Sequence, residues 1–171
     1  MNVVAGFDLS LRASAFCALS SDWGCDWSRA IVGGTGQPLP KDAAEALRLT
    51  RLKLIRNAAL EFVKDHHVRI AVVEQYAFTA LTSQAHALGE LGGVVKTALL
   101  EAGCVVEVVS PASARKLLGK QPRKDAKIWA AQKLYSMGAP RRWTLDHCDA
   151  FLIANYYLAG SGGDAVALEA A

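Results

Sequence analysis

Apolar and polar positions along the chain alternate between short apolar runs and longer helical patterns. Five runs have the length of strands: residues 2–8, 12–20, 25–32, 68–74 and 104–109. Helical periodicity or helix-start signals cover residues 42–65, 83–102, 110–118, 123–137 and 145–158. The first three strands are too closely spaced for crossovers, which favours an antiparallel meander. The pattern predicts an α/β domain with a five-stranded mixed sheet flanked by helices.

Two of the predicted strands end in a carboxylate. The apolar residues 3–7 lead into Asp8, and the apolar residues 70–73 lead into Glu74. A carboxylate at the end of a buried strand costs free energy unless a cation is paired with it. Both strands are expected to be central in the sheet. If they are parallel neighbours, Asp8 and Glu74 lie side by side at the edge where α/β sheets bind ligands.

A third acidic element opens the last predicted helix. Asp146 and Asp149 are three residues apart, so both project from one helical face. If this helix starts over the strand ends, four carboxylates converge, and they repel one another unless a cation is present. Mg²⁺ or Mn²⁺ takes oxygen ligands of this kind. The sequence therefore predicts a divalent metal site.

Each acid also has an ordinary explanation when it is considered alone. Asp8 suits a turn after a strand, Glu74 suits a pair with an arginine, and Asp146 suits a helix cap. Asp149 in the first helical turn suits the helix dipole, and His147 suits an exposed surface. These readings do not account for three separate elements that each carry an acid at one end.

Positive charge is concentrated in one segment. The net charge is only +3, but residues 115–142 hold nine of the nineteen Lys and Arg residues and a single acid, Asp125. Such an excess suits a polyanion such as nucleic acid, although a solvated surface is the common alternative. The candidate nucleic-acid-binding residues of the segment are Arg115, Lys116, Lys120, Arg123, Lys124, Lys127, Arg141 and Arg142.

The helix at residues 42–65 has a mixed pattern. Its predicted buried face comprises Leu47, Leu54, Ala58 and Phe62. The arginines of this helix, including Arg51, are expected to be largely solvated.

Length and composition indicate one globular domain. The 171 residues are 52% apolar and 20% charged, and they suffice for an ordinary core. Residues 1–160 form the predicted domain, and residues 161–171 form a predicted flexible tail. No apolar run reaches the length of a membrane span, and the N-terminus lacks a secretory pattern. A cytoplasmic protein without a membrane partner is therefore expected.

The four cysteines show no pattern of a metal site or a disulfide framework. Cys17, Cys25, Cys104 and Cys148 form no C-x-x-C pair and have no zinc-like spacing. We expect reduced thiols that are mostly buried.

Several motifs in order resemble those of the RuvC-type Holliday junction resolvases, members of the RNase H-like (retroviral-integrase) superfamily. The motifs are G-F-D-L-S at 6–10, V-V-E-Q-Y at 72–76, L-G-E-L-G-G-V at 88–94, R-K-D-A-K at 123–127 and D-H-C-D-A at 146–150. The resemblance covers residues 3 to 158. The chain departs from the bacterial pattern at Asp8-Leu9-Ser10, where those relatives have Asp-Pro-Gly, so it resembles a divergent, viral or phage branch.

The resemblance implies roles for individual residues in an RNase H-like nuclease. It implies that Asp8, Glu74, Asp146 and Asp149 are catalytic and bind two Mg²⁺ ions, which Mn²⁺ can replace. Lys124 matches the family lysine that assists at the phosphate. An aromatic residue after the strand-end glutamate, Tyr76 or Phe78, would contact the junction centre. Leu88, Gly89 and Gly93 lie on a helix that forms a homodimer in the family.

The implied function is structure-specific cleavage of four-way DNA junctions. Each subunit of a homodimer would nick one of two symmetry-related strands by metal-dependent phosphodiester hydrolysis, in association with nucleoid or host-cell DNA. Two alternatives stay open: another RNase H-like nuclease acting on flaps or RNA–DNA hybrids, and a junction-binding protein that does not cut. The four acids argue against the second alternative, since negative charge near phosphate weakens binding.

Overall fold

The computed structural model describes residues 3–20, 22, 30–35, 45–75 and 83–160. Its sheet has five strands: β1 (Val3–Asp8), β2 (Ala15–Ser20), β3 (Ile31–Gly34), β4 (Val68–Glu74) and β5 (Val105–Val109). The strand order is β3-β2-β1-β4-β5. Strand β2 is antiparallel to β1 and β3, whereas β4 is parallel to β1 and β5. The predicted five-stranded mixed sheet is confirmed, and β1 and β4 are parallel neighbours, which was the condition for placing Asp8 beside Glu74.

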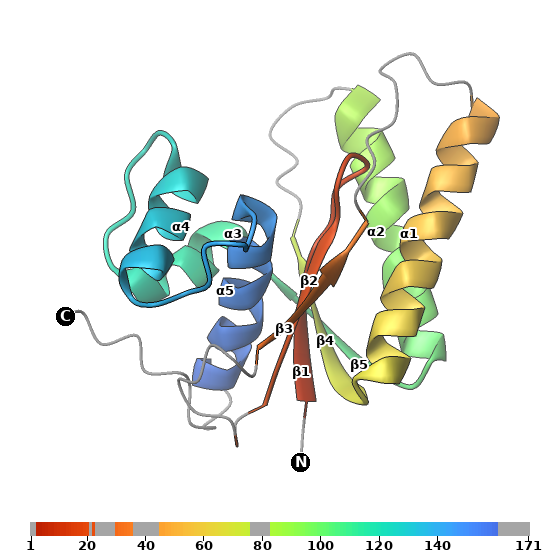
Figure 1. The fold of residues 1–171 in the computed structure, drawn as a ribbon. Helices are drawn as coiled ribbons and strands as arrows, with labels where there is room; N and C mark the ends of the chain where they lie inside the picture. Colours follow the sequence, from red (N-terminus) through yellow and green to blue (C-terminus); the bar gives the residue numbers. More distant parts are fainter. Residues whose placement is uncertain (1–2, 21, 23–29, 36–44, 76–82, 161–171) are drawn as a thin grey trace.

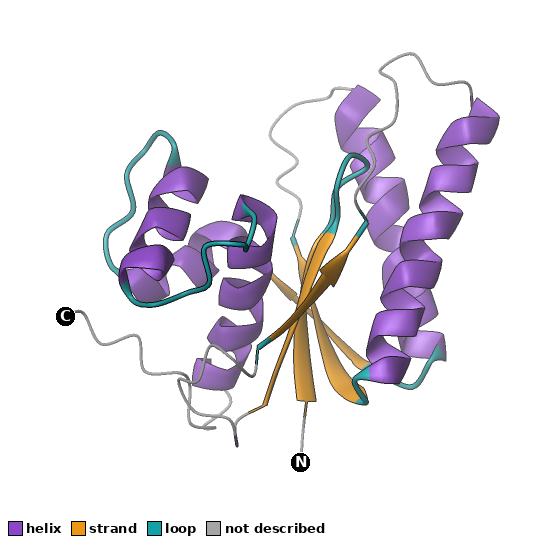
Figure 2. Ribbon diagram, viewed as in Figure 1, coloured by secondary structure: helices purple, strands orange, loops and turns teal. Residues whose placement is uncertain are grey.

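Helices cover both faces of the sheet (Figures 1 and 2). On one face lie α1 (Glu45–Asp65) and α2 (Ser83–Glu101), and on the other lie α3 (Pro111–Arg115), α4 (Ala126–Ser136) and α5 (Leu145–Gly160). A short 3₁₀ helix, Lys116–Leu118, follows α3. None of the described helices is long and apolar enough to cross a membrane.

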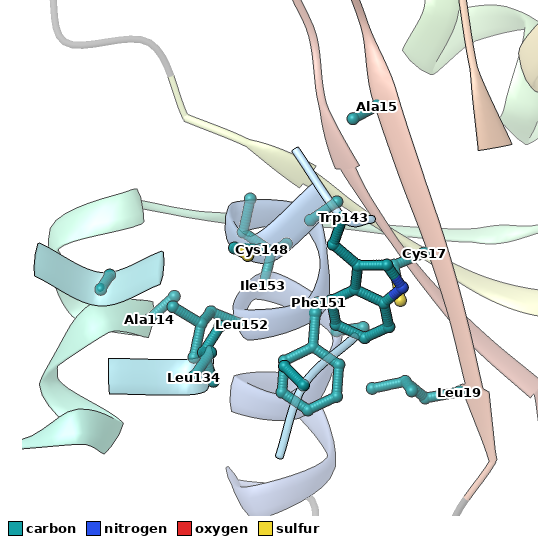
Figure 3. Packing of buried hydrophobic residues seen from close by; sticks show 14 of the residues in the cluster. Ala15, Cys17, Leu19, Ala114, Leu134, Trp143, Cys148, Phe151, Leu152 and Ile153 are labelled. Carbon is teal, nitrogen blue, oxygen red and sulfur yellow. The ribbon is translucent and has the colours of Figure 1, made fainter. Parts of the chain in front are cut away.

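Each face of the sheet has its own apolar core. Beneath α1, the rings of Phe7, Phe16 and Phe62 lie with centroids 5.0–6.4 Å apart. Beneath α5, the rings of Trp143 and Phe151 lie 5.5 Å apart, on the side of the sheet that carries Cys17 and Leu19 (Figure 3). Strand β1 is buried along its whole length because both cores lie against it.

A glycine brings α5 against β1. A Cβ atom at Gly6 would lie 2.0 Å from the carbonyl oxygen of Ala150 and 2.8 Å from the backbone nitrogen of Ala154. No side chain fits at such a separation, so the helix can pack on the strand only where residue 6 is glycine. This close approach places the beginning of α5 near the end of β1.

The third strand differs from its predicted bounds. It was expected to end at residue 32, whereas β3 continues through Gly33 and Gly34. Residues 23–29 lie outside the described part of the chain. The reason for the extension is packing, since a Cβ at Gly34 would meet the carbonyl oxygen of Ser14 at 2.3 Å and one at Gly33 would meet the ring of Phe62 at 2.9 Å. The two glycines thus permit β3 to pair with β2 beneath α1.

The predicted buried face of α1 is right in part. Phe62 is buried and Ala58 packs against the core, but Leu47 and Leu54 are 50% and 54% exposed, and Leu52 and Ile55 face the sheet in their place. The helix contains enough leucine for two apolar stripes, and only packing against the sheet selects between them. Arg51, expected to be solvated, is buried as well.

The cysteine prediction is confirmed for the residues the structure describes. Cys17, Cys104 and Cys148 are buried free thiols, and burial raises the pKa of each. Cys25 lies outside the described residues, as does the predicted tail at 161–171. The division into one domain and a tail stays a prediction.

Candidate active site

Asp8 and Glu74 lie together at one edge of the sheet. Phe7 pairs with Val73 in the parallel register of β1 and β4, so the next residue of each strand is at the same level. Asp8 is only 5% exposed. Burial, and after it the hydrogen bond with Asp8 and the negative charge of Asp8, raise the pKa of Glu74 to about 9. Glu74 therefore keeps its proton at neutral pH and shares it with Asp8 in a hydrogen bond, as expected for two carboxyl groups without a metal ion.

The first turn of α5 adds Asp146 and Asp149 to this edge. Thr144 caps the helix, because its Oγ1 accepts a hydrogen bond from the backbone N–H of His147 at 3.2 Å. The capping role open to Asp146 is thus filled by another residue. Asp149 is 3% exposed and lies on the same side of the helix as Asp146.

Lys127 of α4 connects three of the acids. Its Nζ lies 2.7 Å from Oδ2 of Asp8, 2.5 Å from Oδ1 of Asp146 and 3.4 Å from Oδ2 of Asp149. Burial lowers the pKa of this lysine, but the neighbouring carboxylates outweigh burial and raise it above its ordinary value. Lys127 is therefore a charged counter-ion at the centre of the acidic group.

Arg115 at the end of α3 pairs with Asp149. Its Nε donates to Oδ1 at 2.9 Å and its Nη2 donates to Oδ2 at 2.5 Å. A two-pronged pair of this kind holds the carboxylate in one orientation. Burial lowers the pKa of Arg115, but the hydrogen bond to Asp149 and nearby negative charge raise it above its ordinary value.

The donor set fits a divalent cation, with the ammonium of Lys127 as its stand-in. Carboxylate oxygens of three residues, one on β1 and two on α5, surround this ammonium, and hard cations such as Mg²⁺ take such oxygens as ligands. In the part of the chain that the structure describes, no group of three or more acids, histidines or cysteines is close enough to hold a metal by itself. A metal ion would therefore have to take the position of Lys127 Nζ.

The lysine that reaches the acids is Lys127 and not Lys124. Lys124 precedes α4 and is exposed. The sequence predicted Lys127 only as a nucleic-acid-binding residue. Helical spacing could have indicated its position, since it lies three and four residues before Ala130 and Ala131, the buried face of α4. The role of Lys124 at a phosphate stays a prediction.

In the described part of the chain, the other candidate basic residues form no ion pair with the four acids. Arg115 and Lys127 point into the site, whereas the remaining six are exposed: Lys116, Lys120, Arg123, Lys124, Arg141 and Arg142. Arg141 stacks over the ring of Tyr135 at 5.0 Å. Tyr76 and Phe78, the predicted junction-contacting residues, lie outside the described residues.

His147 contacts β3. Its Nε2 lies 3.2 Å from the carbonyl oxygen of Gly33, and its Nδ1 lies 3.1 Å from Oγ1 of Thr144. Both ring nitrogens thus have partners, and the contact of Nε2 with Gly33 fixes the start of α5 to the sheet.

The predicted dimer helix leaves its glycines uncovered. A Cβ at Gly89 or Gly93 would meet no atom within 4 Å, and Gly93 is exposed. Leu88 on the same helix is partly buried. A cavity of about 610 Å³ lies between α2 and α1, lined by Gly93, Thr97, Leu60 and other residues.

Comparison with solved structures places this arrangement among known folds. Thermus thermophilus RuvC in complex with a Holliday junction substrate matches with a TM-score of 0.68 and 20% identity, over 95% of this chain and 98% of that chain. The chain has a RuvC-type fold. Fowlpox virus resolvase in a complex with Holliday junction DNA matches with a TM-score of 0.60 and 10% identity, over 94% and 99% of the two chains. Yeast mitochondrial Holliday junction resolvase Ydc2 matches with a TM-score of 0.57 and 13% identity, over 91% and 77%.

The RuvC-type fold is recognised here from structure. No family model matches the sequence, and no curated protein matches it. The fold confirms the RNase H-like class expected from the motifs, and the strand ends and helix start that carry the four acids are parts of that fold.

Proposed function

We propose that the protein is a metal-dependent endonuclease that resolves four-way DNA junctions. The observation that carries the proposal is the convergence of Asp8, Glu74, Asp146 and Asp149 around Lys127, within a RuvC-type fold. The solved structures with this fold include resolvases bound to Holliday junction DNA.

The four acids would hold divalent ions, Mg²⁺ or Mn²⁺, and two such ions would supply activation of the attacking water and stabilisation of the leaving oxygen. Asp8 and Asp149, both nearly fully buried, would be the more rigid ligands. Glu74 would give up its proton when a cation binds, because a positive charge replaces the proton as the partner of Asp8.

Two basic side chains, those of Arg115 and Lys127, belong to the same site and act in different ways. Arg115 holds Asp149 in one orientation through its two-pronged pair, so it positions a ligand. Lys127, once displaced from the acids by a metal ion, would be free to donate to a phosphate oxygen beside them. Negative charge that develops on that oxygen would then be stabilised by a preorganised ammonium group.

DNA would approach over the exposed basic residues between Lys116 and Arg142. These residues are exposed and, among the described residues, do not pair with the acids, so their charge is available for backbone phosphates. Binding through such contacts weakens steeply as salt rises.

The protein would act as a homodimer that places one site on each of two symmetry-related strands. The uncovered face of α2, with Gly89 and Gly93, would meet the same face of a second copy because glycine permits close helix approach.

Replacing Gly93 with leucine is expected to convert the dimer to a monomer, and light scattering measures the change in mass. The control Lys64→Leu, at the exposed end of α1, is expected to leave the mass unchanged. An unchanged mass for Gly93→Leu would refute this interface.

The test is cleavage of a synthetic four-way junction with Mg²⁺ or Mn²⁺, beside linear duplex, flap and RNA–DNA hybrid. Wild type is expected to make paired symmetric nicks on the junction. Asp8→Asn is expected to bind the junction without cutting it. Asp65→Asn, which removes an exposed carboxylate at the end of α1, is the matched control and should cut like wild type.

The outcomes separate the alternative functions. Cleavage mainly of the flap or hybrid would assign the site to another RNase H-like nuclease. Tight junction binding without nicking by the wild type would indicate a binding protein.

A further inference from the structure

The turn between β1 and β2 is fixed to α1 by a buried arginine. Nε of Arg51 donates to the carbonyl oxygen of Leu11 at 3.1 Å, and its Nη2 donates to that of Arg12 at 2.8 Å. Nη2 also contacts Oγ1 of Thr35 at 3.3 Å. Arg51 is only 7% exposed, and within the described residues no carboxylate pairs with it. The positive charge of Arg51 therefore makes the turn more positive, because no neighbouring carboxylate among the described residues neutralises it.

Two serines close the same turn. Oγ of Ser14 accepts from the N–H of Ser10 at 3.0 Å and donates to the carbonyl oxygen of Ser10 at 2.8 Å. Oγ of Ser10 accepts from the N–H of Arg12 at 3.1 Å. The backbone of Arg12 is thus held at its N–H by Ser10 and at its carbonyl by Arg51, while its side chain is exposed.

The turn lies next to the acidic group. Asp8 pairs with Ala15 across the two strands, so the turn comprises residues 9–14 and continues beyond the sheet at the edge where β1 ends (Figure 1). Arg12 follows Asp8 by four residues, which limits the separation of their Cα atoms to about 14 Å. One DNA strand advances about 3.4 Å per nucleotide along the helix axis. Arg12 is therefore within a few nucleotides of a phosphate bound at Asp8.

Charge favours an anion at this place. In the described part of the chain, Arg12 has no carboxylate partner, and Arg51 beneath it donates only to neutral oxygens. Holding a mobile arginine in a fixed place normally costs side-chain and backbone entropy, but here the backbone is already ordered by the turn. An exposed guanidinium on a rigid support suits a phosphate oxygen.

We propose that the β1–β2 turn is a second phosphate-binding element, in which Arg12 binds a DNA backbone phosphate flanking the cleaved one and Arg51 is a positioning residue. This inference rests on the proposed nuclease function. The β1–β2 turn extends from the sheet next to the acids, whereas the basic segment 115–142 belongs to α3, α4 and the loops beside them. The strand to be cut is thereby held on both sides of the acidic group.

Junction binding by Arg12→Gln tests the inference, with all variants made in the non-cutting Asp8→Asn protein. Between about 50 and 200 mM salt, the association constant K of the wild-type surface falls as salt rises. In Arg12→Gln the plot of log K against log salt is expected to be shallower by about 0.9, the value for one lost phosphate contact. The Kd is expected to rise several-fold for every junction sequence. Arg69→Gln is the matched control, because Arg69 is an exposed arginine at the start of β4, the opposite end of the sheet. A slope for Arg12→Gln equal to that of Arg69→Gln would overturn the proposal.

The positioning role of Arg51 has its own measurement. Arg51→Lys keeps the charge but replaces the planar fork of two nitrogens, Nε and Nη2, with a single nitrogen on a flexible stem. The turn is then held less rigidly, so Arg51→Lys is expected to weaken binding about as much as Arg12→Gln. Adding Arg12→Gln to Arg51→Lys should then have little further effect, whereas fully additive losses contradict the positioning role. Ser10→Ala, which frees the N–H of Arg12, serves as a second variant if Arg51→Lys does not fold. A protein that binds no DNA refutes the nuclease function as well, while DNA binding with an unchanged Arg12 slope refutes only this inference.

Discussion

Replacing Lys127 with methionine is expected to slow junction cleavage by about 100-fold or more while the Kd for the junction changes by no more than about threefold. The ammonium of Lys127 lies within 3.4 Å of three carboxylates, at the place where the cleaved phosphate would approach. Methionine has a similar length but no charge and no proton to donate. Single-turnover cleavage at saturating enzyme, together with binding measured without cleavage, separates the two quantities.

A second readout concerns the protein without DNA. Removing the ammonium leaves the acids of β1 and α5 without their shared counter-ion, so the midpoint of thermal unfolding should fall in metal-free buffer. Mg²⁺ should raise that midpoint more in Lys127→Met than in wild type, because the metal no longer competes with the lysine.

Lys124→Met is the matched control, and it is expected to affect binding and not the cleavage rate. Lys124 is exposed before α4 begins, so its loss should weaken binding and lower the salt slope without slowing cleavage at saturation. If Lys124→Met instead slows cleavage and Lys127→Met does not, the assignment of the lysine to the acidic group is wrong.

Gly6→Ala is expected to destabilise the protein by about 3 kcal/mol or more. The added methyl group would lie 2.0 Å from the carbonyl oxygen of Ala150, and it meets helix backbone, which has no rotamer to change. Helix α5 would have to move away from β1, and both cores depend on the place of β1 between them. Denaturant or thermal unfolding monitored by circular dichroism measures the loss.

The same substitution at Gly160 is the control for Gly6→Ala. Gly160 ends α5, and a Cβ there meets no atom within 4 Å, so Gly160→Ala should change stability by no more than about 1 kcal/mol. Where Gly6→Ala remains folded, cleavage should fall as well, because Asp149 moves with α5 away from Asp8. Normal stability of Gly6→Ala would contradict the close packing of α5 on β1.

The sequence alone was sufficient for the elements and for the candidate acids. Apolar runs that end in Asp8 and Glu74 predict two central strands, because burying such runs on both faces requires a sheet covered by helices. The three-residue spacing of Asp146 and Asp149 predicts one helical face. These are local properties of the chain, and the fold bears out the predicted class.

Tertiary structure decided which polar side chains meet. Lys124 and Lys127 belong to the same basic run, and helical spacing places only Lys127 on the buried side of α4. The packing of α4 against α5 then brings its ammonium to the acids. Arg51 was expected in solvent but is buried, because the β1–β2 turn offers it the carbonyl oxygens of residues 40 and 39 positions away. The strand at Gly33 and Gly34 also depends on distant neighbours. Periodicity reports the polarity of a position, whereas the partner of a buried charge depends on contacts between segments far apart in the sequence.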